Sequence, residues 1–451
     1  MALGDLEGAT EAGREAIAIF RELGNKAGEA RVRQEISYVR WVSRDYPGAL
    51  EANFEALRIH RQLGNRRGEA VVAGNIAQVY RGVGDHEQAL RWAEKAARIH
   101  HELEDKFGED IRLSTIAAIH RERGDLESAL HLNLKTFNEK VGAKNLIVAQ
   151  HSTCGMLYLR LGDPEKALEH FQAATRLSRE IGYTRDEGYS LMSVGVALER
   201  MGDPAGAAHA YRRAVELLDA ERPTRGMPQA TYEESGASEE LSGKVDALTL
   251  LAELLHRSLD RPEEALSTYE AAEGVCRKLN DRRRLRKLLT SQAGLRWRTG
   301  QLKKSARDYE EALDLARKQK EPASEAAALA SLSVVYRDLG HLKESVRCGR
   351  AALKLLQNLS DPQAKAYVLS SLAQSYGELG HYPSALSCLR RSLRLRRRIG
   401  DKEGEVGVLE DLARIYEGLR DPGRARACSE DAASRRAALA EAHVDAGTGR
   451  R

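Results

Sequence analysis

A short Gly-Asp turn recurs along this 451-residue sequence at a nearly constant interval, and that interval restricts the fold more than any other feature. Successive turns are 40, 40, 40, 38, 40, 57, 41, 40, 40 and 40 residues apart. A fixed period of this size is typical of stacked supersecondary units, each of which buries its apolar face against the next. The turns are Gly4-Asp5, Arg44-Asp45, Gly84-Asp85, Gly124-Asp125, Gly162-Asp163, Gly202-Asp203, Leu259-Asp260, Gly300-Gln301, Gly340-His341, Gly380-His381 and Arg420-Asp421.

Helical patterns flank each turn. Glycine before the turn can end one helix in the left-handed conformation, and aspartate after it can cap the next helix. Four residues after the aspartate position comes a small residue followed by leucine, and the small side chain lets two helices approach closely. No segment alternates with period two for long enough to form a strand, so the sequence predicts an all-α chain of antiparallel helix pairs. The small-residue pairs are Ala49-Leu50, Ala89-Leu90, Ala129-Leu130, Ala167-Leu168, Ala265-Leu266 and Ala385-Leu386.

The first helix of each unit carries its own signature, a small residue followed in five units by tyrosine three positions later. The small residues are Ala77, Ala117, Gly155, Gly195, Ala252, Ala293, Ser333, Ala373 and Ala413, and the tyrosines are Tyr80, Tyr158, Tyr336, Tyr376 and Tyr416. This pattern resembles the tetratricopeptide repeat, in the roughly 40-residue form of kinesin light chains, Leu-Gly-Asn-repeat proteins and bacterial regulators. The resemblance implies a right-handed α-solenoid, or superhelix, of about ten helix pairs.

The repeats divide the chain into five segments. Residues 1–26 hold a half repeat with only the second helix, which is expected of an N-terminal cap or of a piece of a longer protein. Residues 27–220 and 244–442 hold about five repeats each. The 57-residue interval adds 17 residues between them, and the polar stretch 221–243 is expected to be an inter-repeat loop, either a tolerated insertion or a functional lid or hinge. Residues 443–451 are expected to form a disordered tail.

Composition and motifs exclude several classes of function. No stretch approaches 18 uninterrupted apolar residues, and the N-terminus has no basic region followed by an apolar one, so neither a membrane span nor a signal peptide is expected. The five cysteines are odd in number and form no CxxC pair, which favours a reducing, cytoplasmic location. Phosphate-loop, GxGxxG, HExxH and GxSxG motifs are missing. We therefore expect no catalytic residues, no cofactor and no metal.

The resemblance also implies a site, because the first helices of such arrays line the concave surface and bind partners there. Counting from the small residue of each first helix, the expected groove residues are Trp41, Asn75, Gln78, Arg81, Arg121, Lys287, Trp297 and Arg337. The tryptophans are the expected anchors, with packing between repeats as the alternative. In the Leu-Gly-Asn-repeat family an asparagine holds the peptide backbone, and here only Asn75 matches it; serine or threonine mostly replaces it elsewhere.

Three functions fit these features. The first is a non-enzymatic scaffold or adaptor that binds a peptide or helix of a partner protein, possibly an acidic one. The second is nucleic-acid binding, unlikely but open, through residues 277–320, where 15 Lys and Arg stand against 5 Asp and Glu. Few aromatic residues lie near this cluster, which weakens the case for single-stranded RNA. The third is a regulatory sensor region of a larger signalling protein.

Overall fold

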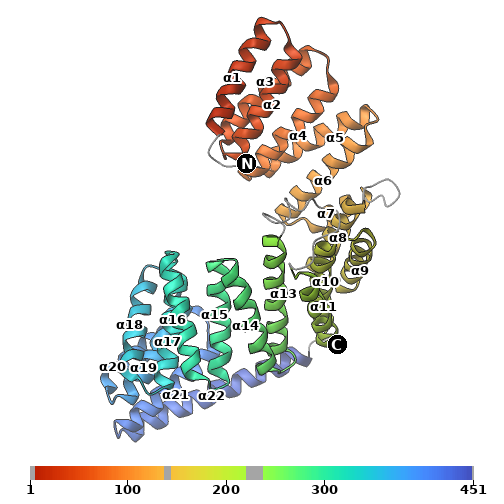
Figure 1. Ribbon diagram of the computed structural model, residues 1–451. Coiled ribbons are helices and arrows are strands. Elements are labelled where there is room, and N and C mark those ends of the chain that lie inside the picture. Colours follow the sequence, from red (N-terminus) through yellow and green to blue (C-terminus); the bar gives the residue numbers. More distant parts are fainter. Residues whose placement is uncertain (1–5, 137–143, 220–236, 449–451) are drawn as a thin grey trace. The chain divides into compact units, whose positions relative to one another are not determined.

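The computed structural model describes residues 6–136, 144–219 and 237–448, and these fold into helices joined by short turns (Figure 1). No strand occurs in the described ranges, so the all-α prediction is confirmed. The first helices are α1 (Leu6–Glu22), α2 (Lys26–Val42), α3 (Tyr46–Gln62), α4 (Arg66–Val83), α5 (His86–Glu102), α6 (Lys106–Arg123), α7 (Leu126–Lys135), α8 (Lys144–Leu161), α9 (Pro164–Ile181), α10 (Thr184–Arg200) and α11 (Pro204–Leu217). The remainder are α13 (Ala237–Arg257), α14 (Pro262–Lys278), α15 (Arg282–Arg298), α16 (Leu302–Lys318), α17 (Pro322–Asp338), α18 (Leu342–Gln357), α19 (Pro362–Glu378), α20 (Tyr382–Ile399), α21 (Lys402–Gly418) and α22 (Pro422–Thr448).

Consecutive helices pack as hairpins. The most extensive contacts join α19 to α20, α17 to α18, α21 to α22, α4 to α5, α2 to α3 and α8 to α9, and within α1–α11 and within α13–α22 each hairpin packs on the next. This is the predicted solenoid of stacked helix pairs. The chain divides into two compact units, the first ending at Leu217 and the second containing α13 to α22. We call them the first unit and the second unit.

The turns have the predicted geometry in most repeats. Gly84 ends α4 with a φ of 86°, and the Asp85 side chain caps α5 by accepting a hydrogen bond from the Gln88 amide at 3.1 Å. One turn is shifted by a residue from the prediction. The left-handed residue there is Asp260, with a φ of 48°, and Arg261 occupies the cap position without a side-chain cap bond. This register restores the 40-residue step to Gln301, so the interruption before it is one residue longer than predicted.

The small residues of both helices lie at the contacts within and between hairpins, as predicted. Ala49, Ala89 and Ala129 have no exposed surface, and neither do Ala77 and Ala293. Where the first helix has glycine, a large ring fills the space. A Cβ built on Gly155 would lie 2.5 Å from the Phe171 ring, and one on Gly195 would lie 2.4 Å from the Tyr211 ring. A smaller side chain on the first helix is therefore compensated by a larger one on the second helix, so the interior of the hairpin stays filled.

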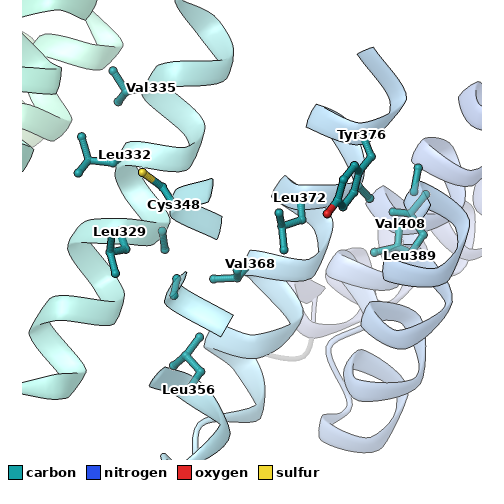
Figure 2. Packing of buried hydrophobic residues seen from close by; sticks show 14 of the residues in the cluster. Leu329, Leu332, Val335, Cys348, Leu356, Val368, Leu372, Tyr376, Leu389 and Val408 are labelled. Carbon is teal, nitrogen blue, oxygen red and sulfur yellow. The ribbon is translucent and has the colours of Figure 1, made fainter. Parts of the chain in front are cut away.

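One apolar core runs through the second unit from α15 to α22. Figure 2 shows Leu329, Leu332 and Val335 of α17 and Cys348 of α18 in this core, which continues through α19 to Leu389 and Val408. Cys348 belongs to this core, and burial raises the pKa of its thiol. All five cysteines are free, in line with the predicted role of Cys348, Cys388 and Cys428 as small packing residues.

Two predicted boundaries differ from the structure. Helix α13 begins at Ala237, so the last residues of the predicted loop 221–243 are helical; residues 220–236 lie outside the described ranges. The reason is the helical spacing of Leu241, Val245 and Leu248, which gives this stretch an apolar face. Helix α22 runs on to Thr448, through most of the predicted tail, because alanine, a strong helix former, recurs as far as Ala446. None of the described helices has the length and apolar character needed to cross a bilayer.

Candidate functional site

The first candidate site is a groove in the second unit that crosses successive first helices. Two adjoining depressions, of about 570 and 350 Å³, make up this groove and have four lining residues in common, Arg337, Gln374, Asp411 and Arg414. We call it the α17–α21 groove. Its other lining residues are Asp338, Ala373, Gly377, Glu378, Tyr382, Leu389, Ile415 and Gly418 in the first depression, and Trp297, Val334, Tyr367, Ser370, Ser371, Arg396, Gly404, Gly407, Val408 and Glu410 in the second.

A row of hydrogen bonds runs across this groove from helix to helix. Arg337 of α17 donates to the Gln374 side chain of α19, and Gln374 Nε2 donates to Asp411 Oδ2 of α21 at 3.1 Å. Arg414 also donates to Asp411. Burial raises the pKa of the Asp411 carboxyl, and the Arg414 and Gln374 contacts oppose that rise. The row fixes polar groups at a regular spacing along three consecutive repeats.

The surface of the groove combines both signs of charge with an open floor. The side chains of Arg414, Glu378 and Glu410 are 68%, 52% and 41% exposed, so neither sign dominates the rim. A Cβ built on Gly407 would meet no atom within 4 Å, so the backbone of α21 is accessible there. A partner that enters the groove can therefore contact the α21 backbone, carboxylates and guanidinium groups at the same time.

Of the predicted residues in the second unit, Trp297 and Arg337 line the groove. The Trp297 indole donates from Nε1 to Asp338 Oδ2 at 2.6 Å, and the residue is 39% exposed. The tryptophan thus both contacts the next repeat and keeps an exposed face. Lys287 is exposed on α15 but is not among the lining residues, so the structure does not bring it together with the other two.

A second candidate site lies in the first unit, where three predicted residues converge. Trp41 of α2 and Asn75 and Gln78 of α4 line one pocket of about 260 Å³. We call it the Asn53 pocket, after the residue contributed by α3. Its remaining lining residues are Ser37, Tyr38, Asn53 and Val79.

Arg81 and Arg121 are not part of this pocket. Arg81 lies one turn beyond Gln78 on α4, and its Nε is 3.5 Å from Glu122 Oε1 of α6. Arg121 is half-buried on α6. The structure therefore separates the predicted groove residues of the first unit into a pocket of uncharged side chains and two cations outside it.

Sequence reasoning missed Asn53, because it considered only first helices as a source of site residues. Asn53 lies eight residues after the turn aspartate, a position that holds Ala93, Phe171, Tyr211, Tyr269, Tyr309 or Leu389 in other repeats. All of these are buried in the structure. Asn133 is the other amide at this position, so the sequence signals Asn53 only as one of two amides at a position that these repeats use for packing. Leaving such a buried group without a hydrogen bond costs about 1–3 kcal/mol.

The basic cluster at residues 277–320 is partly neutralised by the fold. Arg286 pairs with Glu321 at 2.6 Å, and Arg296 is buried between Glu270 at 2.8 Å and Asp308. Further pairs join Arg277 to Glu273 and Glu311, Arg284 to Asp246 and Asp281, Arg317 to Glu325, and Lys318 to Asp314. Six of the fifteen cations are thus engaged by carboxylates, several of which lie outside the cluster in the sequence.

Comparison with known families supports the repeat pattern over much of the chain. The sequence matches the tetratricopeptide repeat family over residues 39–102, 68–138 and 147–220, and again over 366–399. Residues 292–379 match the family of anaphase-promoting complex subunit 5. No match was found among curated proteins.

Several solved structures resemble the chain. A Signal Transduction ATPase with Numerous Domains protein with a tetratricopeptide repeat sensor, from Pyrococcus horikoshii, is 14% identical over 84% of this chain and 55% of its own, with a TM-score of 0.53. BtubC from P. vanneervenii is 21% identical over 51% of this chain and 90% of its own, with a TM-score of 0.43. The apo quorum sensor NprR from B. thuringiensis is 14% identical over 84% and 99%, with a TM-score of 0.46. At these identities the likeness concerns the fold alone.

Proposed function

This chain is a tetratricopeptide repeat protein, and we propose that it is a non-enzymatic scaffold that binds a segment of a partner protein in the α17–α21 groove. The observation that carries the proposal is the groove itself, which is continuous across three successive first helices. Its length suits an extended or helical segment better than a small molecule. Trp297 is the proposed anchor at one end, since an exposed aromatic ring beside polar groups is typical of binding hot spots.

The charged residues of the groove indicate which charges a partner segment should carry. Arg414 on the rim attracts carboxylates, whereas Glu378 attracts cations; Glu410 is paired with Arg436. A purely acidic segment would meet repulsion from Glu378. We therefore propose a partner segment that carries both positive and negative charges, in place of the acidic segment expected from the sequence.

The test is a block of the groove at Gly407. Because a Cβ at this position meets open space, Gly407→Leu introduces a side chain into the groove without a clash. Peptides selected on the wild-type protein from a random display library would be measured by fluorescence polarisation. We expect Gly407→Leu and Arg337→Ala each to weaken their binding by about tenfold or more.

Gly274→Leu on α14 is the matched control, because Gly274 is exposed, also has no neighbour within 4 Å and is not among the groove residues. This variant should bind like the wild type. Selected peptides that bind equally to Gly407→Leu, or a selection that yields no binder, would contradict the proposal.

The two other functions have less support. The ion pairs of residues 277–320 withdraw charge from the surface that a nucleic acid would need. The sensor function stays a prediction, because a likeness of fold does not carry a regulatory role.

A further inference from the structure

Asn53 is the one residue of the Asn53 pocket whose side chain is completely buried, at 0% exposure. Neither its Oδ1 nor its Nδ2 has a hydrogen-bond partner among the described residues. Buried amide groups in folded proteins are almost always paired. An unpaired donor and an unpaired acceptor on one side chain that lines a pocket point to a group that is supplied from outside.

The neighbourhood explains why the fold does not satisfy this amide. Asn133 occupies the same repeat position in α7, and its Nδ2 donates to the carbonyl of Ala129 one turn earlier, at 2.8 Å. The corresponding carbonyl for Asn53 is that of Ala49. It already accepts a hydrogen bond from the Ser37 hydroxyl of α2, at 3.0 Å. The carbonyl that would correspond to the partner of Asn133 is thus already engaged by Ser37 in the repeat of Asn53.

The remaining lining residues define the chemistry of the missing group. No lining residue of the pocket is charged, so a charged ligand group would lose its hydration without gaining a counter-ion. Trp41 and Tyr38 are 37% and 61% exposed, with ring centroids 6.0 Å apart, and provide flat apolar surface. Asn75 and Gln78 add further amides. The ligand group is therefore neutral, has both a donor and an acceptor, and fits a pocket of about 260 Å³.

From these observations we propose that the Asn53 pocket binds the side-chain carboxamide of a glutamine or asparagine in a partner polypeptide. A primary carboxamide matches Asn53 on both sides: its NH₂ donates to Oδ1, and its carbonyl accepts from Nδ2. A hydroxyl group carries its O–H donor and its acceptor lone pairs on one oxygen atom, whereas the carboxamide presents donor and acceptor on two separate atoms, side by side like those of Asn53. The methylene groups of the ligand side chain would pack on the Trp41 and Tyr38 rings. This site lies in the first unit and is independent of the α17–α21 groove.

The test uses the full chain and two small probes, N-acetylglutamine N-methylamide and N-acetylleucine N-methylamide. The probes share the backbone amides and differ in the side-chain carboxamide. Binding is followed by the indole N–H signals in nuclear magnetic resonance spectra of tryptophan-labelled protein, with Trp297 as an internal reference outside the pocket. We expect the glutamine probe to shift the Trp41 signal and to bind about tenfold or more tightly than the leucine probe.

Asn53→Leu should abolish this preference and, because it replaces an unpaired amide by an apolar side chain of similar size, should raise the thermal unfolding midpoint. Asn133→Leu is the matched control: it removes a hydrogen bond that exists, so it should lower the midpoint and leave the preference unchanged. Gln78→Leu should reduce the preference in part, which provides a second variant in the same pocket.

Three results would overturn the proposal. Equal binding of the two probes would show that the pocket recognises only backbone amides or apolar surface. Absence of any shift at Trp41 would show that the pocket takes neither probe. A preference that survives Asn53→Leu, or an unfolding midpoint lowered by that substitution, would show that the Asn53 amide is not an unpaired recognition group.

Discussion

Single side chains decide how each interhelical turn closes, and His60 illustrates this at the scale of the residue. Its ring packs against Gly68 so tightly that a Cβ there would lie 2.3 Å from Nδ1. Phe20 makes the same contact with Gly28 one repeat earlier. His60 Nε2 lies 2.8 Å from Gln34 Nε2, which is a donor, so the histidine nitrogen accepts and is unprotonated. Burial also lowers the pKa of His60, because the surroundings penalise the charged form of the ring.

This environment predicts a pH dependence of stability. Because the pKa of His60 is lower in the folded state than in the unfolded chain, protons bind preferentially to the unfolded state. The stabilising contribution is complete above the unfolded value of about 6.5 and is lost as the pH falls through the folded value. His60→Phe should keep the ring contact, as Phe20 does, and should show a smaller fall in the thermal unfolding midpoint between about pH 7 and pH 5.

Since His170 and His256 also have lowered pKa values, the informative quantity is the difference between the wild-type and variant profiles rather than the wild-type slope. Identical profiles would mean that His60 has the same proton affinity in both states.

Site residues were only partly predictable at this scale. The family resemblance and the repeat register predicted Trp41, Asn75 and Gln78 as residues of one surface, and in the structure all three line one pocket. Lys287 was predicted to share a groove with Trp297, but the two residues lie ten positions apart on α15, which separates them by about 15 Å along the axis. Asn53 required knowledge of which hydroxyl reaches the Ala49 carbonyl, and no spacing rule contains that information.

Helix pairs are the level at which this chain is most constrained. Within each hairpin a small residue of the first helix faces a residue of the second, and the volumes compensate. Tyr211 has no exposed surface and lies against Gly195, and its hydroxyl donates to Glu199 on the same first helix. The ring is therefore held at both ends and has little freedom to move aside.

Overpacking at this contact should be costly. Gly195→Ala places a methyl group where the Tyr211 ring lies, so we expect it to lower the stability of the protein by about 1–3 kcal/mol, measured by chemical denaturation. Gly274→Ala is the control, since its Cβ meets open space and alanine favours a helix by up to about 1 kcal/mol. A neutral Gly195→Ala would show that the hairpin can widen at no cost.

The sequence was enough to predict which helices form, their order and their pairing, because the same helix–turn–helix pattern recurs about every 40 residues. The exceptions have a physical cause. The predicted turn at Asp260 has leucine followed by aspartate, where other repeats have glycine followed by aspartate. Aligning this aspartate with the others placed the turn one residue too early. Only the spacing to Ala265, which is buried like its counterparts, identifies Arg261 as the cap position.

At the scale of the molecule, many charged side chains of the described residues are balanced in pairs. The net charge of +4 is small, and the densest basic stretch meets carboxylates from α13, α14, α16 and α17. Guanidinium groups that already pair with carboxylates neutralise few phosphates of a nucleic acid. Few of the counter-ions condensed on the nucleic acid would therefore be released on binding. Electrostatic attraction to nucleic acid is therefore expected to be weak.

A direct measurement follows from this balance. A labelled 20-base-pair duplex and a single strand of the same length would be titrated with the protein at about 150 mM salt and followed by fluorescence anisotropy. We expect no saturable binding of either, and no change with Arg282→Glu and Arg283→Glu together. Saturable binding that weakens steeply with salt and depends on these arginines would restore the nucleic-acid alternative.

The left-handed residue in the turns has a consequence for which sequences can form a repeat. Glycine fills this position in many turns, but Arg44, Glu104, Asp260, Asn280, Lys320 and Arg420 adopt the same positive φ at a cost of about 1–2 kcal/mol each. The turn thus needs a backbone torsion that several residue types can adopt, and it does not depend on glycine at this position. A repeat can therefore depart from the usual turn sequence and still form its helix pair. The tetratricopeptide repeat matches stop at 220 and resume at 366, yet the hairpins α13/α14, α15/α16 and α17/α18 lie between. Within this one chain, the helix pair therefore extends further than the sequence pattern of the family.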